Sequence, residues 1–121
     1  MSFGDPVTVT INSVGKSLVK INQDAYGSEY LFRSSSEELR LKIRHQVESA
    51  KAGIVPFERH NLELRHTVFA VPPSTMVTER VFAFTIRARK GDDPASVSLS
   101  CQGLVDFLTD PNLAKAVGWE S

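Results

Sequence analysis

Three long segments of the chain alternate apolar and polar residues with a period of two. They span Glu38–Ser49, Phe57–Ala70 and Met76–Arg89. Successive side chains of a β-strand point to opposite faces of a sheet, so this period predicts three long antiparallel strands. One face of the predicted sheet is apolar. The other carries one acid, Glu63, and seven cations: Arg40, Lys42, Arg44, Arg59, Arg65, Arg87 and Arg89.

Shorter alternating segments precede the long ones and predict an N-terminal β-hairpin. Val7–Asn12 and Lys16–Asn22 alternate on either side of a short turn that contains Gly15. Glu29–Arg33 then predicts a short strand, which three serines end. The sequence therefore predicts a hairpin over residues 7–22 and an antiparallel sheet of about five strands over residues 29–90.

The period changes to that of a helix after Lys90. Asp93 and Pro94 form a helix-start signal, because an Asp side chain caps free backbone amides and proline suits the first helical turn. Five residues at helical spacing predict an amphipathic helix of about 16 residues: Val97, Cys101, Leu104, Val105 and Leu108. A second start signal at Asp110-Pro111 predicts a short helix over Asn112–Val117, ended by Gly118. Strands followed by two helices, within residues 94–117, indicate an α+β fold.

The composition is that of one soluble globular domain spanning residues 1–121. Apolar residues make up 41% of the chain and charged residues 23%, and the formal net charge is zero, which argues against indiscriminate coating of nucleic acid. A single cysteine, Cys101, excludes an internal disulfide. No apolar segment has the length of a membrane helix and the N-terminus lacks the regions of a signal peptide, so we expect folding in the cytosol.

The predicted helices are too short to cover the predicted sheet. The strand Phe57–Ala70 spans about 46 Å at roughly 3.3 Å per residue, whereas the first helix spans about 24 Å at roughly 1.5 Å per residue. A large apolar face left in water is unusual for a monomer. We therefore expect an obligate homodimer, with sheets joined edge to edge and helices lying across the partner's sheet. In the alternative arrangement, the N-terminal hairpin folds over the exposed half.

The candidate chemical groups do not predict an enzyme. His45, His60 and His66 fall on the apolar parity, but no acid or cysteine completes a metal site, so we interpret them as hydrogen-bonded histidines beneath the helices. Cys101 is interpreted as a small hydrophobe. Phosphate-binding loops, nucleophile elbows and metalloprotease motifs are absent from the sequence. No cofactor is expected. Four acids lie near helix ends, where we interpret them as caps of the helices: Asp92, Asp93, Asp106 and Asp110. A structural calcium ion held by such acids between subunits is the alternative.

Three short segments carry a likeness to a known family: KINQDAYGSEYLFR at 20–33, FERHN at 57–61 and GWES at 118–121. They resemble the coat proteins of single-stranded RNA bacteriophages, the leviviruses, and their Caulobacter-phage branch in particular. Gln102-Gly103-Leu104 falls where other members carry a similar helix segment. The resemblance implies an intertwined dimer and an icosahedral virion shell, with the sheet inside and the helices outside, after folding in the host cytoplasm. It also implies that one loop meets neighbouring subunits at the symmetry axes: Val71, Pro72, Pro73, Ser74 and Thr75.

The resemblance further implies that the inner sheet face binds genomic RNA and, in several members, an RNA hairpin that represses translation. By position, the RNA-facing residues are Arg40, Lys42, Arg44, Arg59, Asn61, Thr85 and Arg87, and Arg65 and Arg89 share their parity. Lys and Arg neutralise phosphates and release counterions, and Arg also stacks on splayed bases. Val81 and Ala83 stand where aromatic and amide groups would read a hairpin, and no aromatic base platform is evident on this face.

Two other interpretations of the basic face remain. It could be an ordinary solvated face, since antiparallel sheets often leave one side wet. It could also belong to a dimeric RNA-binding regulator that never assembles into a shell.

Overall fold

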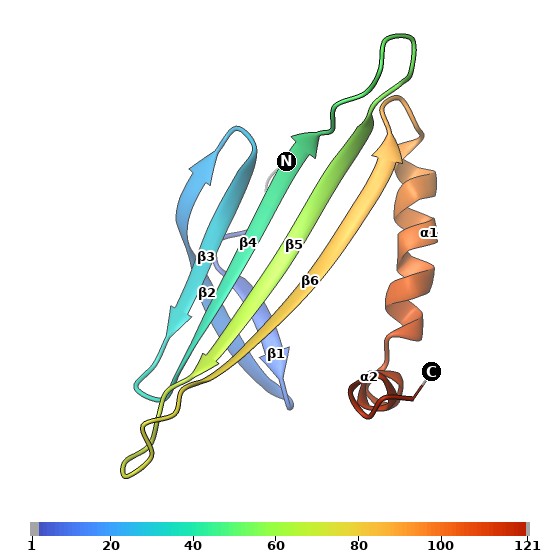
Figure 1. Ribbon diagram of the computed structural model, residues 1–121. Coiled ribbons are helices and arrows are strands. Elements are labelled where there is room, and N and C mark those ends of the chain that lie inside the picture. The colour runs from blue at the N-terminus through green and yellow to red at the C-terminus, as the bar shows by residue number, and fades with distance from the viewer. Residues whose placement is uncertain (1–2, 121) are drawn as a thin grey trace.

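The computed structural model describes residues 3–120, which form six strands followed by two helices (Figure 1). The elements are β1 (Val7–Ile11), β2 (Val14–Asp24), β3 (Gly27–Arg33), β4 (Glu37–Val47), β5 (Phe57–Val68), β6 (Thr78–Arg89), α1 (Pro94–Phe107) and α2 (Asp110–Val117). The strands pair in sequence order, each antiparallel to the next, in one sheet. The predicted α+β class is confirmed. The two strands of the N-terminal hairpin continue the sheet, so all six strands belong to it.

The first hairpin turns one residue earlier than predicted. Ile11 pairs with Val14, which leaves Asn12 and Ser13 as a two-residue loop with φ values of 48° and 66°. Two successive positive φ angles give the turn whose twist matches that of the flanking strands. Gly15, on which the predicted turn relied, instead lies inside β2.

A glycine at the start of β3 permits a close approach of two strands. A Cβ added at Gly27 would lie 2.1 Å from the backbone oxygen of Ile43, so a side chain cannot fit without moving β4. The preceding loop is held by Asp24, whose Oδ1 accepts a hydrogen bond from the Tyr26 amide at 2.8 Å. This turn sets the β3–β4 register, in which Gly27 lies opposite Arg44.

The start of α1 is as predicted and the second helix begins earlier. Asp93 accepts hydrogen bonds from the Ala95 amide and the Ser96 hydroxyl, at 3.3 and 2.7 Å, with Pro94 in the first turn. α1 has 14 residues instead of about 16, and α2 starts at Asp110 because this acid and the following proline fit its first turn. Within residues 3–120 neither helix is long and apolar enough to cross a membrane.

The buried core lies on the β2–β4 side of the sheet. It consists of Leu18, Tyr30, Leu39 and Ile43, each at most 2% exposed. Three residues of β1 pack against it, Val7, Val9 and Ile11, and the hairpin turns behind the sheet in Figure 1. The alternative arrangement, in which the hairpin covers part of the apolar face, is therefore realised on this side.

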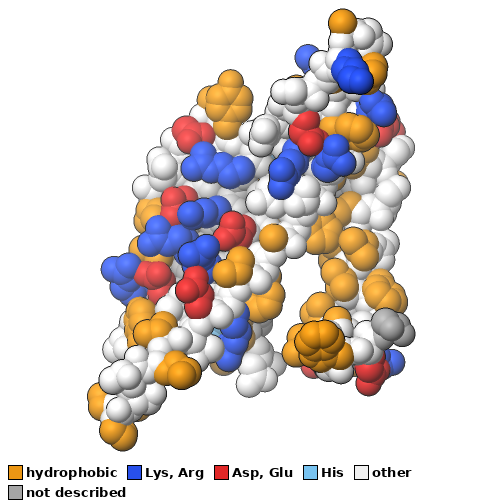
Figure 2. Space-filling view, viewed as in Figure 1, with side chains coloured by type: hydrophobic (Ala, Val, Ile, Leu, Met, Phe, Trp, Pro, Cys, Tyr) orange, Lys and Arg blue, Asp and Glu red, His pale blue; other side chains and the backbone are white. Residues whose placement is uncertain are grey.

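The β5–β6 side of the apolar face is left open. Phe82 is 55% exposed, and neither helix contributes a buried residue. α1 runs beside β6 and α2 follows it on the same side of the sheet, and both helices leave apolar side chains exposed (Figures 1 and 2). Leu99, Phe107 and Trp119 are 75%, 64% and 96% exposed. One chain therefore leaves a large apolar surface in water, as the lengths of the elements predict.

Candidate nucleic-acid interface

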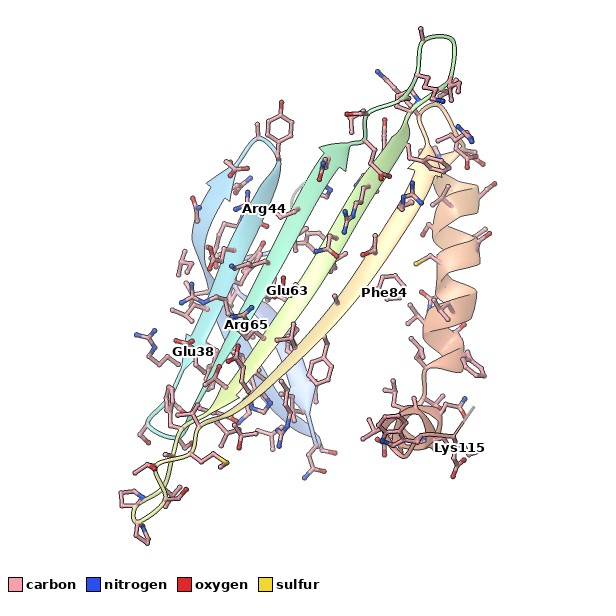
Figure 3. The ribbon with its side chains drawn as sticks, viewed as in Figure 1. Glu38, Arg44, Glu63, Arg65, Phe84 and Lys115 are labelled. Carbon is pink, nitrogen blue, oxygen red and sulfur yellow. The ribbon has the colours of Figure 1, made fainter. Side chains whose placement is uncertain are left out.

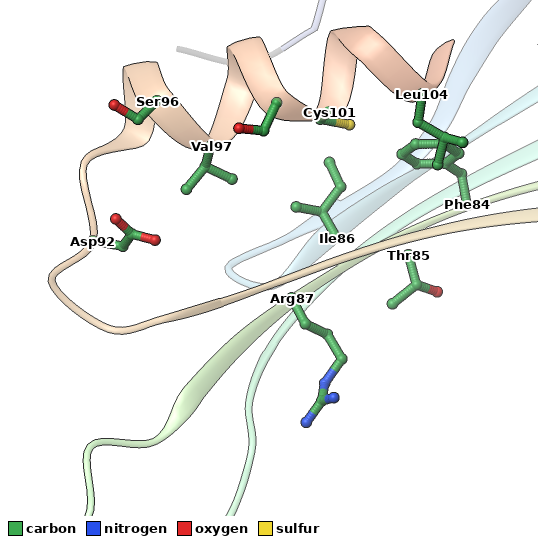
Figure 4. A pocket seen from close by; sticks show the side chains of 10 residues that line it. Phe84, Thr85, Ile86, Arg87, Asp92, Ser96, Val97, Cys101 and Leu104 are labelled. Carbon is green, nitrogen blue, oxygen red and sulfur yellow. The ribbon is translucent and has the colours of Figure 1, made fainter. Parts of the chain in front are cut away.

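The strand register gathers all nine predicted RNA-facing residues onto one face. Arg40 lies opposite Arg65, Arg59 opposite Arg87, and Asn61 opposite Thr85. Figure 4 shows the alternation on β6: Phe84 and Ile86 point toward α1, whereas Thr85 and Arg87 point to the other side. We call this side the polar face. On it lie Arg40, Lys42, Arg44, Arg59, Asn61, Arg65, Thr85, Arg87 and Arg89.

The predicted ratio of seven cations to one acid on this face is wrong. The register adds one cation, Arg33, and five carboxylates to the set. Two of them, Asp24 and Glu29, come from segments outside the three long strands. The other three, Glu38, Glu48 and Glu79, lie inside those segments with the parity of the cations, so the period of two would have placed them on this face. Figure 2 shows blue and red side chains interleaved over the sheet, and Figure 3 labels Glu38, Arg44, Glu63 and Arg65 among them. The polar face thus carries eight cations and six acids.

Most of these charges are ion-paired across strands. Arg40 lies 2.6 Å from Glu29, Arg44 3.0 Å from Asp24, Arg87 2.6 Å from Glu48, and Arg65 lies 3.4 and 3.1 Å from Glu63 and Glu79. Glu63 therefore pairs with an arginine of its own strand. Half-exposed pairs of this kind add little stability. Their effect is electrostatic, since a phosphate must compete with a carboxylate for each paired arginine.

Asp24 has hydrogen-bond donors on two sides. The backbone N–H of Tyr26, and then the Arg44 guanidinium, hold the pKa of Asp24 below its ordinary value. The carboxylate therefore stays ionised at neutral pH. Arg44 is held at the β2–β3 turn as a result.

The excess positive charge of the polar face lies at one corner. Within residues 3–120, Arg59 and Arg89 have no carboxylate within 4.0 Å. Arg87, which lies opposite Arg59, forms an ion pair with Glu48. We call Arg59, Arg87, Arg89 and Glu48 the basic corner. Lys42 is also without an ion pair in the described residues, but its register neighbours are two acids, Glu29 and Glu63.

An aromatic ring stands in the basic corner, so the expectation of no aromatic platform on this face is wrong. Phe57 pairs with Arg89 and shares the parity of Arg59. The guanidinium carbons of Arg87 and Arg89 each lie 4.4 Å from the centroid of its ring. Phe57 is the first residue of β5, and the same period of two that places Arg59 would have placed it.

A shallow hollow lies next to the basic corner. It has a volume of about 150 Å³ and is lined by Arg44, Gln46, Arg59 and Asn61. The Thr85 hydroxyl donates to Oδ1 of Asn61 at 2.9 Å, which fixes the amide. Two guanidinium groups and two amides around one hollow provide donors for phosphate oxygens and for base edges.

The three histidines lie on the apolar side, but the element that covers His66 and the exposure of His45 differ from the prediction. His66 is 8% exposed and bonds Oε2 of Glu37 at 2.9 Å, while Lys16 bonds the other oxygen at 2.8 Å. His66 is thus covered by the N-terminal hairpin and not by a helix. His45 is exposed, and its Nδ1 lies 2.8 Å from that of His60. Among residues 3–120 no three metal-ligating side chains come together.

An apolar gap separates α1 from β6. Its volume is about 430 Å³, and Phe84, Ile86, Val97, Cys101 and Leu104 face into it (Figure 4). Cys101 therefore has the apolar surroundings expected of it. The gap is open, so α1 does not seal its own sheet.

Comparisons with known proteins point in one direction. The profile of the family described as "Phage phiCb5, coat protein" matches residues 4–89, which include all six strands. No curated protein sequence matches the chain.

Solved structures extend the likeness over the helices. The bacteriophage EMS014 coat protein is 16% identical with a TM-score of 0.64, and the match covers 86% of this chain and 72% of that one. The virus-like particle of bacteriophage AVE019 is 11% identical with a TM-score of 0.64, covering 97% and 95%. A protein described as an unassembled virus coat protein dimer and bacteriophage RNA-binding dimer is 16% identical with a TM-score of 0.52, covering 97% and 95%. At these identities the likeness establishes a common fold.

Proposed function

Because the chain belongs to the coat-protein family of phage phiCb5, we propose that it dimerises, assembles into a closed icosahedral shell and holds single-stranded RNA on its polar face. The family is one of structural proteins of the virion and not of enzymes. The activity proposed is accordingly binding alone: apolar burial between chains, and attraction between cations and phosphates. The chain folds in the host cytoplasm before it enters the shell.

The free edge of β6, next to an uncovered apolar surface, is the observation that carries the proposal. The Lys90 amide donates to the Pro56 carbonyl, which fixes the phase of hydrogen bonding between β5 and β6. By alternation, the N–H groups of Val81, Ala83 and Thr85 point away from β5, toward the free edge. Unpaired edge groups of a long strand favour pairing with another chain. A second β6 in antiparallel orientation satisfies them and respects two-fold symmetry.

The helices supply the rest of the dimer contact. Leu62, Leu64, Phe82 and Phe84 line an open apolar hollow of about 400 Å³, which the chain's own Leu108 and Leu113 also border. In an edge-to-edge dimer this surface lies next to the partner's β6, and the partner's α1 can lie across it. The exposed apolar side chains of α1, including Leu99 and Phe107, have the matching character.

The connection between β5 and β6 is the proposed contact between dimers. It includes Val71–Thr75 and projects beyond the end of the sheet (Figure 1). Val71 and Met76 are 71% and 78% exposed, although both are apolar. An apolar segment held away from its own core is suited to burial against a neighbouring subunit.

RNA contact is assigned to the polar face through the nine residues named above. Unpaired cations neutralise phosphates without regard to sequence, which suits packaging of a whole genome. The side chains at Val81 and Ala83 offer no aromatic or amide group to a hairpin. We therefore favour general RNA packaging over repression of translation as the function of this face.

Gel filtration and electron microscopy of the expressed protein test the proposal. We expect uniform particles that contain nuclease-protected RNA. A species that stays near 27 kDa, twice the 13.4 kDa chain, at every concentration would instead support the non-assembling RNA-binding regulator.

A further inference from the structure

Phe57 is unusual in its position on the sheet. It is the one aromatic side chain that strand residues place on the polar face, since Tyr30, Phe32, Phe82 and Phe84 pair with apolar-face positions. The ring is half-buried at the first position of β5, beside the arginines of the basic corner.

The two arginines beside the ring are held in place by the backbone and by an acid. Nε of Arg87 donates to Oε2 of Glu48 at 2.6 Å, and Nη1 of Arg89 donates to the Val55 carbonyl at 2.9 Å. Both guanidinium carbons lie 4.4 Å from the centroid of the Phe57 ring. The Arg87 side chain nevertheless remains 50% exposed. Both guanidinium groups therefore lie in fixed positions against the ring, with Arg87 accessible to solvent, and fixed groups lose less entropy on binding.

We propose that the cluster of Phe57, Arg87 and Arg89 binds an unpaired nucleobase of single-stranded RNA by stacking. The inference rests on the proposed function, because it names the part of the RNA that this face takes. Bases stack on guanidinium planes and aromatic rings regardless of sequence. Arg59 lies opposite Arg87 in the register and is free to hold the adjoining phosphate. Bases inside a duplex are already stacked, so the site selects unpaired RNA.

Binding of a short single-stranded oligonucleotide that carries a fluorescent purine analogue tests this site. Phe57→Leu should weaken binding about tenfold and abolish the quenching of the analogue, since one base–aromatic stack contributes on that scale. Arg89→Lys keeps the charge and the ring but removes the guanidinium plane. It should reduce quenching while the salt dependence of binding stays that of the wild type, and it reports on the stack even if Phe57→Leu folds poorly.

Two matched controls carry the same chemical changes elsewhere. Arg33→Lys alters an ion-paired arginine of the polar face, where Nε bonds Glu38 at 2.9 Å, and Phe32→Leu alters a ring on the opposite face. Both should bind and quench like the wild type. The inference is overturned if Phe57→Leu and Arg89→Lys also behave like the wild type, or if the wild type binds an abasic strand equally well. A wild type that binds no RNA would overturn the proposed function itself, and this inference with it.

Discussion

Glu37 is a charged residue on the apolar side of the sheet, where an unpaired carboxylate would be costly. Lys16 from β2 and His66 from β5 each bond one of its oxygens, at 2.8 and 2.9 Å. The hydrogen bond from Lys16, followed by that from His66, holds the pKa of Glu37 below its ordinary 4.5. This triad joins the N-terminal hairpin to the central strands, so its loss would loosen the cover of the core.

Glu37→Gln should lower the free energy of unfolding by about 1–2 kcal/mol near neutral pH, the scale of a hydrogen bond to a charged group. Because the pKa is lowered in the folded state, the ionised carboxylate stabilises fully above its ordinary value of 4.5. That stabilisation is lost as the pH falls through the lowered pKa. The difference between wild type and variant should therefore shrink in acid. Urea unfolding at one protein concentration over a range of pH measures it.

Glu38→Gln is the matched control for this prediction. Glu38 is the next residue, lies on the polar face and pairs with a mostly exposed arginine, Arg33. Its replacement should change stability by less than about 0.5 kcal/mol at any pH. Equal effects of the two substitutions would contradict the special role of the triad.

At the scale of the elements, β6 is an edge strand, and the backbone N–H groups on its outer side have no partner strand within residues 3–120. Its outward N–H groups include that of Ala83, near the middle of the strand. Proline at this position removes an edge donor without removing a bond to β5. By two-fold symmetry one substitution affects the interface twice, at about 1 kcal/mol for each missing hydrogen bond.

Ala83→Pro should therefore shift the protein from dimers and particles to monomers or aggregates, as gel filtration at several concentrations would show. Circular dichroism would establish that the sheet is retained. Ala83→Val keeps the donor and should assemble normally. Persistence of dimers in the proline variant would mean that the chains join through another edge or face.

The connection between β5 and β6 gives a second prediction at this scale. Replacing Pro72 and Pro73 by glycine increases the freedom of the unassembled loop and should cost about 1–2 kcal/mol for each ordered loop. Particles should then dissociate at lower urea concentrations while dimers stay intact, by light scattering and gel filtration. Ala52→Gly loosens the β4–β5 connection instead and should leave particles unaffected. Loss of the dimer would place the loop inside the dimer contact.

The elements differ in how far the sequence could predict them. The period of two correctly predicts the long strands and the face on which each side chain lies, because successive side chains of a strand point to opposite faces. The acids that pair with Arg40 and Arg44 cannot be assigned in the same way, because they come from β3 and β2, whose register depends on turns such as the one at Gly27. The open position of α1 beside β6 depends on how whole elements pack, and no short segment of the sequence predicts it.

At the scale of the whole molecule, the polar face is nearly balanced instead of strongly basic. Its ion pairs cancel most of the cationic charge, and the excess lies in the basic corner. A shell built from such faces would attract RNA at defined positions and would not bind it uniformly. This arrangement is consistent with a chain whose formal net charge is zero.

The salt dependence of RNA binding distinguishes unpaired from paired cations. For single strands, the slope of log K against log salt changes by about 0.7 for each phosphate that the protein no longer neutralises. Replacing Arg59 and Arg89 by glutamine should flatten the slope by about that amount for each residue. Replacing Arg33 and Glu38 together removes one cation and one acid from the same face, so the net charge is kept and the slope should not change. Equal slopes for both double variants would mean that RNA responds to the face as a whole, and the basic corner would then have no special role.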